Sequence, residues 1–319
     1  MVSKTIPWHV SPWQRIDRAW QRERMPHALL LEGPAGLGKL DFAWRVVRLV
    51  MNLPEPAEGT ESVVPLGADI HYLTLEEDKK QIGVEAVRQL CTKLVMTSHA
   101  GGFKVAVISP AETLNNHAAN SLLKTLEEPT PDTLLILVRS RLDTLPATIA
   151  SRCQRLRFVT PERSVALEWL DGRAPGKNWD RLLTLSGGAP MRAVQLAEKG
   201  IEDLDKQFQA DLLRLAAGKA DPVAVAAEWK KHDLPDCLTW LNTAVTGMIL
   251  AATSGADSCS DDLQNLSKSL RLERLFWYLD EVQGASARTR AALTPQLVLE
   301  TLLIPWTGRL EQVQPGAVM

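Results

Sequence analysis

The stretch His27–Asp41, HALLLEGPAGLGKLD, decides the fold. It begins as a short apolar run that ends in glycine, which is typical of a buried parallel strand running into a turn. Residues 39–51 then place Phe42, Val46 and Leu49 at three- and four-residue steps, the spacing of an amphipathic helix. A strand, a glycine-rich loop and a helix in this order predict a phosphate-binding loop at the amino end of the helix.

The loop matches the pattern G-x-x-x-x-G-K and lacks the Ser or Thr that normally follows. Gly33, Gly36 and Gly38 would let backbone N–H groups face a phosphate, and Lys39 would neutralise it. Leu40 stands where a hydroxyl normally coordinates Mg²⁺, which a leucine cannot do. We therefore predict a degenerate nucleotide site that takes ATP, ADP or phosphate without hydrolysis. A chance glycine-rich turn is the alternative.

A second part of an ATP site is expected where a later strand ends, as one or two acidic residues that hold Mg²⁺. The strand KVAVI (104–108) is followed instead by Ser109 and Pro110. Glu112 lies further on, at an offset from which its side chain would not point into the same site. We assign it to the first turn of the next helix, where negative charge is favourable.

Helix-length segments separate short apolar runs along the first half of the chain. The predicted strands are 27–33, 70–75, 104–109, 134–138 and 156–159, with helices between them. This alternation implies βαβ units and a parallel sheet with helices on both faces. Residues 162–200 predict two or three short helices. Beyond about residue 205 the periodic segments are helical, at 221–231, 236–252, 266–283 and 294–304, and loops are expected at 53–68 and 253–265.

Composition narrows the class of protein. The 319 residues are 45% hydrophobic and 23% charged with a formal net charge of -2, which is ordinary for a globular protein and provides no global positive field for nucleic acid. The 4 cysteines form no C-x-x-C pair, so neither a zinc knuckle nor a disulfide framework is indicated. Scattered cysteines and the lack of a signal peptide or a long apolar span predict a cytoplasmic protein without a membrane segment.

Five further segments carry a resemblance to a known family. They are PHA (26–28), NSLLKTLEEP (120–129), LPATIASRC (145–153), GGAPMRA (187–193) and TPQLVLETLL (294–303). Together they resemble the clamp-loader subunits of bacterial DNA polymerase III from end to end. The resemblance implies an AAA+ P-loop domain (1–160), a small helical lid (161–204) and an all-α collar (205–319) that packs side by side with other subunits in a hetero-pentamer.

The resemblance also implies the role of Arg152. In this family the arginine of the S-R-C motif, here Ser151, Arg152 and Cys153, projects from one subunit into the ATP site of the next. The alternative is a surface arginine that pairs with a local carboxylate. Cys153 itself is expected to be a small buried residue and not a nucleophile. Arg192 matches the sensor-2 arginine, which touches nucleotide in active subunits and is vestigial if the site has lost its function.

The departures from the family pattern resemble the delta-prime type, which keeps S-R-C and loses the motor residues. The run Arg139-Ser140-Arg141 replaces the threonine-rich sensor-1 turn of active relatives. No cysteine precedes Val84, so the four-cysteine zinc module of many relatives is missing, and we predict no structural zinc or other metal.

The resemblance implies a stator without intrinsic enzyme activity, whose DNA-directed DNA polymerase (nucleotidyltransferase) classification belongs to the holoenzyme. The implied partners are motor (gamma/tau-type) and delta-type subunits, with the sliding clamp and primed DNA reached through the complex. Two alternatives remain: an ATP-hydrolysing motor subunit and a non-catalytic, DNA-binding scaffold.

Overall fold

The computed structural model describes residues 6–54, 66–76, 79, 81–99, 101–140, 145–255, 259–288 and 294–307. The described residues fall into two compact units. One comprises the chain up to Lys177 together with Gly188–Ala193, and the other Asn178–Gly187 together with the chain from Val194 onward. Residues 161–204 are thus divided between the units, and the three-domain division made above stays a prediction.

The first unit is built on a parallel sheet. Its strands are β1 (Ala28–Glu32), β2 (Ile70–Leu73), β3 (Lys104–Ile108), β4 (Thr133–Arg139) and β5 (Gln154–Arg157), in the order β2-β3-β4-β1-β5. Each neighbouring pair is parallel. The α/β fold predicted from the alternation of strands and helices is confirmed.

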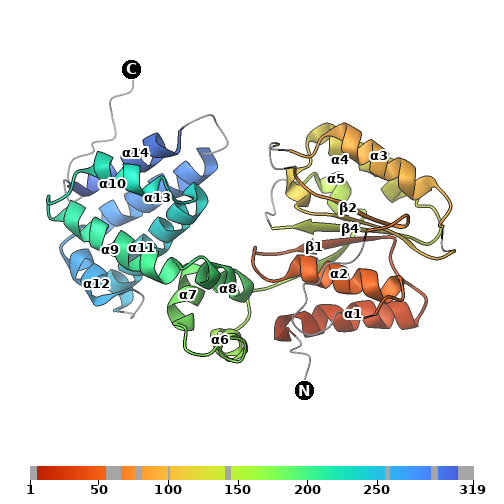
Figure 1. Ribbon diagram of the computed structural model, residues 1–319, viewed down its shortest axis with the longest axis horizontal. Coiled ribbons are helices and arrows are strands. Elements are labelled where there is room, and N and C mark those ends of the chain that lie inside the picture. The colour runs from red at the N-terminus through yellow and green to blue at the C-terminus, as the bar shows by residue number, and fades with distance from the viewer. Residues whose placement is uncertain are drawn as a thin grey trace. The chain divides into compact units, whose positions relative to one another are not determined.

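Both faces of the sheet are apolar, because successive side chains of a strand point to opposite faces. Leu29 and Leu31 join the core under α1 (Val10–Gln21) and α2 (Lys39–Val50). Leu30 joins the core under α3 (Val84–Val95) and α4 (Asn116–Glu127) on the other face (Figure 1). The central strands are therefore buried along their whole length, which accounts for their continuous apolar sequence.

The remaining elements of this unit are short. They are the 3-10 turns η1 (Pro7–His9) and η2 (Ala111–Thr113), and the helices α5 (Ala147–Ala150) and α6 (Arg163–Asp171). Helix α8 (Pro190–Glu198) begins in this unit and ends in the other.

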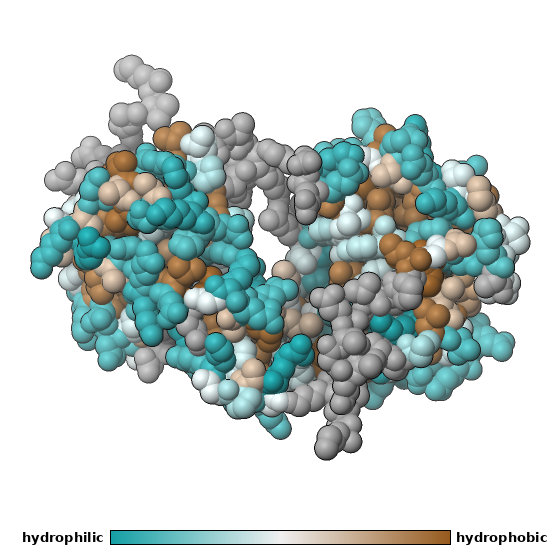
Figure 2. All heavy atoms as spheres, viewed as in Figure 1, coloured by the Kyte–Doolittle hydropathy of each residue, from teal (hydrophilic) through white to brown (hydrophobic). Residues whose placement is uncertain are grey.

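The second unit is helical, as predicted. It contains α7 (Trp179–Leu185), α9 (Ile201–Ala216), α10 (Pro222–Trp229), α11 (Leu234–Ser254), α12 (Asp261–Lys268), α13 (Leu272–Arg288) and α14 (Pro295–Thr307). On the face shown in Figure 2, hydrophobic side chains of the described residues lie in separate groups between hydrophilic ones. Phe276 on α13 is an exposed hydrophobic side chain.

Three expected boundaries were wrong. Strand β5 starts two residues earlier than 156 and Val159 lies outside it, 72% exposed. The expected helix 266–283 is two helices, because the backbone around Ser269 turns with three-residue hydrogen bonds and the Ser269 hydroxyl bonds to the Leu266 carbonyl at 2.7 Å. The expected loop 253–265 is shorter, since α12 already begins at Asp261. Most of the loop at 53–68 lies outside the described residues.

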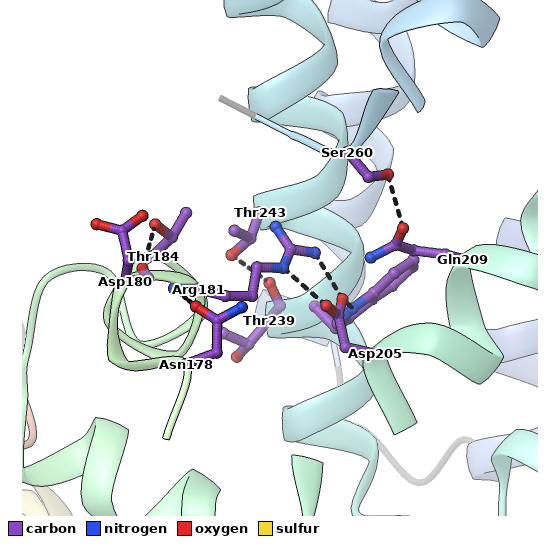
Figure 3. Close-up of polar contacts among 10 residues, drawn as sticks. Asn178, Asp180, Arg181, Thr184, Asp205, Gln209, Thr239, Thr243 and Ser260 are labelled. Atoms are coloured by element: carbon purple, nitrogen blue, oxygen red, sulfur yellow. Dashed lines mark hydrogen bonds and ion pairs between the residues drawn. The ribbon is translucent and has the colours of Figure 1, made fainter. Parts of the chain in front are cut away.

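A buried ionic cluster joins α7 to α9 and α11 (Figure 3). Arg181 donates from Nε and Nη2 to the two carboxylate oxygens of Asp205, at 2.7 and 2.5 Å. The indole N–H of Trp240 donates to the same carboxylate at 2.5 Å. Burial raises the pKa of Asp205, but the hydrogen bonds from Arg181 and Trp240 outweigh it and hold the pKa below its ordinary value.

We expect Asp205→Ala to lower the free energy of unfolding of the full chain by about 3–5 kcal/mol, because it leaves a half-buried guanidinium without its carboxylate. Urea denaturation at neutral pH measures this loss. Asp203→Ala, an exposed acid on the same helix, is the control and is expected to change little.

The pH dependence follows from the lowered pKa. A carboxyl whose folded pKa is depressed stabilises the fold above its unfolded pKa, and this stability disappears as the pH falls through the folded value. The difference between wild type and Asp205→Ala is therefore constant down to about the ordinary value of 3.8 and shrinks below it. A difference that does not change across this range would contradict the ion pair.

Candidate functional site

The glycine-rich loop connects β1 to α2 at the carboxyl edge of the sheet. Gly33, Gly36 and Gly38 all adopt positive φ, at 145°, 76° and 75°. Non-glycine residues rarely take these conformations, so the glycines of the motif are required by the backbone itself. Helix α2 begins at Lys39, directly after the left-handed Gly38.

Lys39 is buried and turned onto its own loop. Its ammonium donates to the carbonyl oxygens of Gly33 at 2.8 Å and of Pro34 at 2.5 Å. Burial lowers the pKa of Lys39 to about 8, and the charge of Glu112 opposes this shift. The cation predicted to neutralise a phosphate is thus engaged with backbone carbonyls.

Two further loop carbonyls are held from outside the loop. The carbonyl of Leu37 accepts from the indole of Trp8 at 2.9 Å and from Nε2 of His9 at 2.7 Å. Burial lowers the pKa of His9 to about 4, so the ring is neutral at physiological pH. The carbonyl of Gly36 accepts from the backbone N–H of Met191 at 3.0 Å. These contacts tie the loop to η1 and to the start of α8.

The predicted sensor-2 arginine lies against this loop. A Cβ built on Gly36 would come within 2.4 Å of Cβ of Arg192 and 2.9 Å of its backbone nitrogen. The structure therefore brings Arg192 together with the predicted phosphate-binding residues.

The positions that would hold Mg²⁺ in a motor protein carry no ligand for it. Leu40 packs against the apolar core next to α2, and β3 is followed by Ser109 and Pro110. Glu112 lies in the 3-10 turn η2, not in the helix predicted for it. Its Oε1 accepts the backbone N–H of Ser140 at 3.0 Å, and its charge acts on Lys39. These residues do not fit a bound Mg²⁺–nucleotide complex.

A buried ion pair that the sequence analysis missed occupies the same edge of the sheet. Glu32, the last residue of β1, contacts Nη2 of Arg139 at 2.5 Å and Nε of Arg157 at 3.0 Å. Burial raises the pKa of Glu32, but the hydrogen bonds from these arginines outweigh it and the pKa is lowered. Arg139 thus links the predicted sensor-1 strand to β1, while Arg141 lies outside the described residues. The sequence offered one signal for this ion pair, namely a glutamate, Glu32, at the end of an otherwise apolar strand.

Arg152 lies at the surface, between α5 and β5. Its side chain is 36% exposed, and Nη2 lies 2.5 Å from Oε1 of Glu127. Its Nη1 donates to the carbonyl of Thr148 at 3.0 Å and contacts Ser151 Oγ at 3.5 Å. The local carboxylate of the alternative interpretation is therefore present, and both side chains of the pair are exposed to solvent.

The pairing of the strands separates Arg152 from the loop. β5 runs parallel to β1, with Gln154 opposite Leu29 and Arg157 opposite Glu32. Arg152 precedes β5 and so lies at the amino edge of the sheet, whereas the loop follows the carboxyl edge. Measured along the strands, Arg152 and the start of the glycine-rich loop are about six residues apart, which is about 20 Å at the usual rise per residue.

Cys153 is buried, and burial raises the pKa of its thiol to about 11. The thiol is therefore protonated at neutral pH and is a poor nucleophile. Among the described residues no group of His, Cys, Asp or Glu side chains is arranged to hold a metal ion. None of the described helices is long and apolar enough to cross a membrane.

We expect Gly36→Ala to lower the free energy of unfolding more than Gly101→Ala does. Both residues have similar positive φ, 76° and 72°, but no atom lies within 4 Å of a Cβ built on Gly101. The left-handed conformation alone costs roughly 1–2 kcal/mol in each variant. The contact with Arg192 adds about 1–3 kcal/mol in Gly36→Ala only. Urea denaturation measures both variants, and equal losses would contradict the packing of residues 189–192 on the loop.

Comparisons with known proteins agree with one another. The family model described as DNA polymerase III, delta subunit matches residues 8–162. DNA polymerase III subunit delta' of Pseudomonas aeruginosa is 32% identical over 96% of this chain and 98% of its own. The subunit delta' of Escherichia coli is 28% identical over 98% and 97%.

A solved structure supports the fold. The DNA polymerase III, gamma subunit-related protein of Thermotoga maritima aligns with a TM-score of 0.50 and 20% identity, over 92% of this chain and 99% of its own. The alignment includes both the parallel sheet and the helical region of this chain. The chain belongs to the family of DNA polymerase III delta' subunits.

Proposed function

We propose that the chain is the delta'-type stator subunit of a DNA polymerase III clamp loader and that Arg152 acts in trans at the ATP site of a neighbouring motor subunit. The observation that carries the proposal is the placement of Arg152. It is half-exposed at the amino edge of the sheet, about 20 Å along the strands from the chain's own loop. Such an arginine is out of reach of its own phosphate loop and open to a second protein.

The chemistry of arginine suits this role. A guanidinium stays charged at any physiological pH, and its planar fork matches the oxygens of a phosphoryl group. Negative charge gathers on those oxygens in the transition state of transfer, so a fixed positive group there lowers the barrier. Because the arginine belongs to a different chain, ATP is hydrolysed only where the subunits have assembled.

The carboxyl edge of this chain supports the stator role. Lys39 is engaged with loop carbonyls, Leu40 offers no hydroxyl, and Ser109 and Pro110 stand directly after β3 where acids are expected. We propose that the loop holds nucleotide or phosphate at most, and only after Lys39 leaves the carbonyls of Gly33 and Pro34. Arg192, whose Cβ and backbone nitrogen lie against Gly36 at the start of α8, would then be available to contact it.

The partners proposed for the chain are gamma/tau-type motor subunits and a delta-type subunit, assembled as a hetero-pentamer in the bacterial cytoplasm. The sliding clamp and primed DNA are reached through that complex. The helical second unit would be the collar that holds the subunits together. The chain is then a subunit of the polymerase holoenzyme and has no catalytic activity of its own.

We expect Arg152→Ala to slow ATP hydrolysis and clamp loading by the reconstituted complex. An arginine supplied in trans typically contributes about 10³–10⁵ to the rate of hydrolysis. ATP hydrolysis at the motor-subunit site that faces this chain should therefore nearly stop. Arg152→Lys keeps the charge and loses the fork, and we expect it to recover only a small part of the rate. Steady-state ATP turnover and the rate of clamp loading onto primed DNA measure both variants.

Arg155→Ala is the matched control, since Arg155 lies on β5, three residues after Arg152, and donates a hydrogen bond to the Ala150 carbonyl at 3.3 Å. Gel filtration should show that all variants assemble equally. Clamp loading that is unaffected by Arg152→Ala would favour a scaffold without a role at an ATP site.

A second prediction concerns the purified chain. With Mg²⁺ and ATP, we expect turnover no higher than that of Lys39→Ala, because Leu40 replaces the Mg²⁺-binding hydroxyl and Ser109 and Pro110 replace the acids expected directly after β3. Leu40→Thr should not create activity, since the acid after β3 is still missing. A phosphate-release assay measures this, and Mg²⁺-dependent hydrolysis lost in Lys39→Ala would identify a motor subunit instead.

A further inference from the structure

Glu127 determines where the guanidinium of Arg152 lies in the unassembled chain. It is the last residue of α4, and its carboxylate lies 2.5 Å from Nη2 of Arg152. The carbonyl of Thr148 accepts from Nη1 of the same guanidinium at 3.0 Å. The arginine is therefore folded back over α5 and onto the end of α4.

We propose that Glu127 is a counter-ion that docks Arg152 and competes with the neighbouring subunit's nucleotide for it. This inference rests on the proposed function. An N–H of Nη2 that points at the carboxylate is not directed at a phosphate. A carboxylate held beside the guanidinium also repels the phosphate oxygens and cancels part of the positive charge that they would meet. Arg152 must therefore exchange one anion for the other to act in trans.

The exposure of the pair makes this exchange feasible. The side chains of Arg152 and Glu127 are 36% and 49% exposed, so water reaches both ions of the pair. Exposed pairs of this kind shift an equilibrium by about fivefold or less. A phosphate group carries more charge and is met at a drier subunit interface, where the same attraction is stronger. The arginine therefore stays on Glu127 until a neighbour presents nucleotide.

The adjacent residue Glu128 provides a matched control. It has the same charge and follows Glu127 directly, but no ion pair involving its carboxylate is described in the part of the chain that the structure covers. A general effect of removing negative charge from this surface would appear equally in Glu128→Gln. An effect on the docking of Arg152 would appear only in Glu127→Gln.

The test is a double-mutant cycle in the reconstituted complex of motor and delta subunits. The chain is supplied as wild type, Glu127→Gln, Arg152→Ala or the double variant, and kcat/KM for ATP is measured. We expect Glu127→Gln to raise kcat/KM by about 1.5-fold to fivefold, because the competing anion is gone. Glu127→Ala should give the same gain and Glu128→Gln none. The gain should disappear when Arg152 is also replaced.

Salt provides a readout that a structural role would not change. An exposed ion pair is screened as ionic strength rises, so the gain from Glu127→Gln should shrink between about 0.05 and 0.3 M salt. Thermal unfolding of the full chain and gel filtration of the complex establish that folding and assembly are equal among the variants. A gain that is independent of salt would overturn the docking role.

The remaining outcomes separate the two proposals. If Arg152→Ala leaves turnover unchanged, the arginine does not act in trans, and the proposed function and this inference both fail. If Arg152→Ala slows turnover while Glu127→Gln leaves it unchanged or slows it, only this inference fails. In the slower case Glu127 would orient the arginine instead of competing for it.

Discussion

The parallel pairing of β1 with β4 and β5 is the constraint on which the rest of the first unit depends. It places every loop that follows a strand at the carboxyl edge of the sheet and every residue that precedes a strand at the amino edge. The glycine-rich loop follows β1, and Arg152 precedes β5, so one register fixes both positions. The fold thus places the predicted phosphate loop and Arg152 at opposite edges of one sheet.

At the carboxyl edge, charged groups around the predicted nucleotide site are engaged with one another or with the backbone. Lys39 bonds to loop carbonyls, and Arg139 at the sensor-1 strand pairs with Glu32. Glu112 accepts a hydrogen bond from the backbone N–H of Ser140, directly after β4. Among the described residues of this edge, the positions expected to hold Mg²⁺ carry no ligand for it. The buried charged groups must therefore form ion pairs or hydrogen bonds within the chain, because a buried charge without a partner destabilises the fold. The charged groups of this edge are thus satisfied within the chain itself.

The sequence predicted the layers of the fold well, and the physical reason is local. Continuous apolar runs mark strands buried on both faces, and the glycines of the loop are required by their own backbone angles. The edge strand β5 was misplaced because only Leu156 among its residues is buried, so its apolar pattern is weak. The break between α12 and α13 was missed because it depends on serine hydroxyls that bond to nearby carbonyls, which hydrophobic spacing does not report.

The ion pairs of the site could not be read from the sequence, since they join residues far apart along the chain. Glu32 and Arg139 are 107 positions apart, and their contact exists only because β1 and β4 are neighbours. Glu127 could be recognised as part of a motif, but its contact with Arg152 depends on the packing of α4 against α5. Motifs therefore identified the residue types, and the fold determined which charges meet.

Two arginines of this chain form similar ion pairs that differ in burial. Arg139 and Arg152 each lie 2.5 Å from a glutamate, yet the first pair is 6% and 3% exposed and the second 36% and 49%. Separating the buried pair would leave Arg139 and Glu32 without a partner and without water. The free energy required to separate them is therefore high. Water already solvates both ions of the exposed pair, so Arg152 can leave Glu127 easily. The role proposed for Arg152 requires a pair of the second kind.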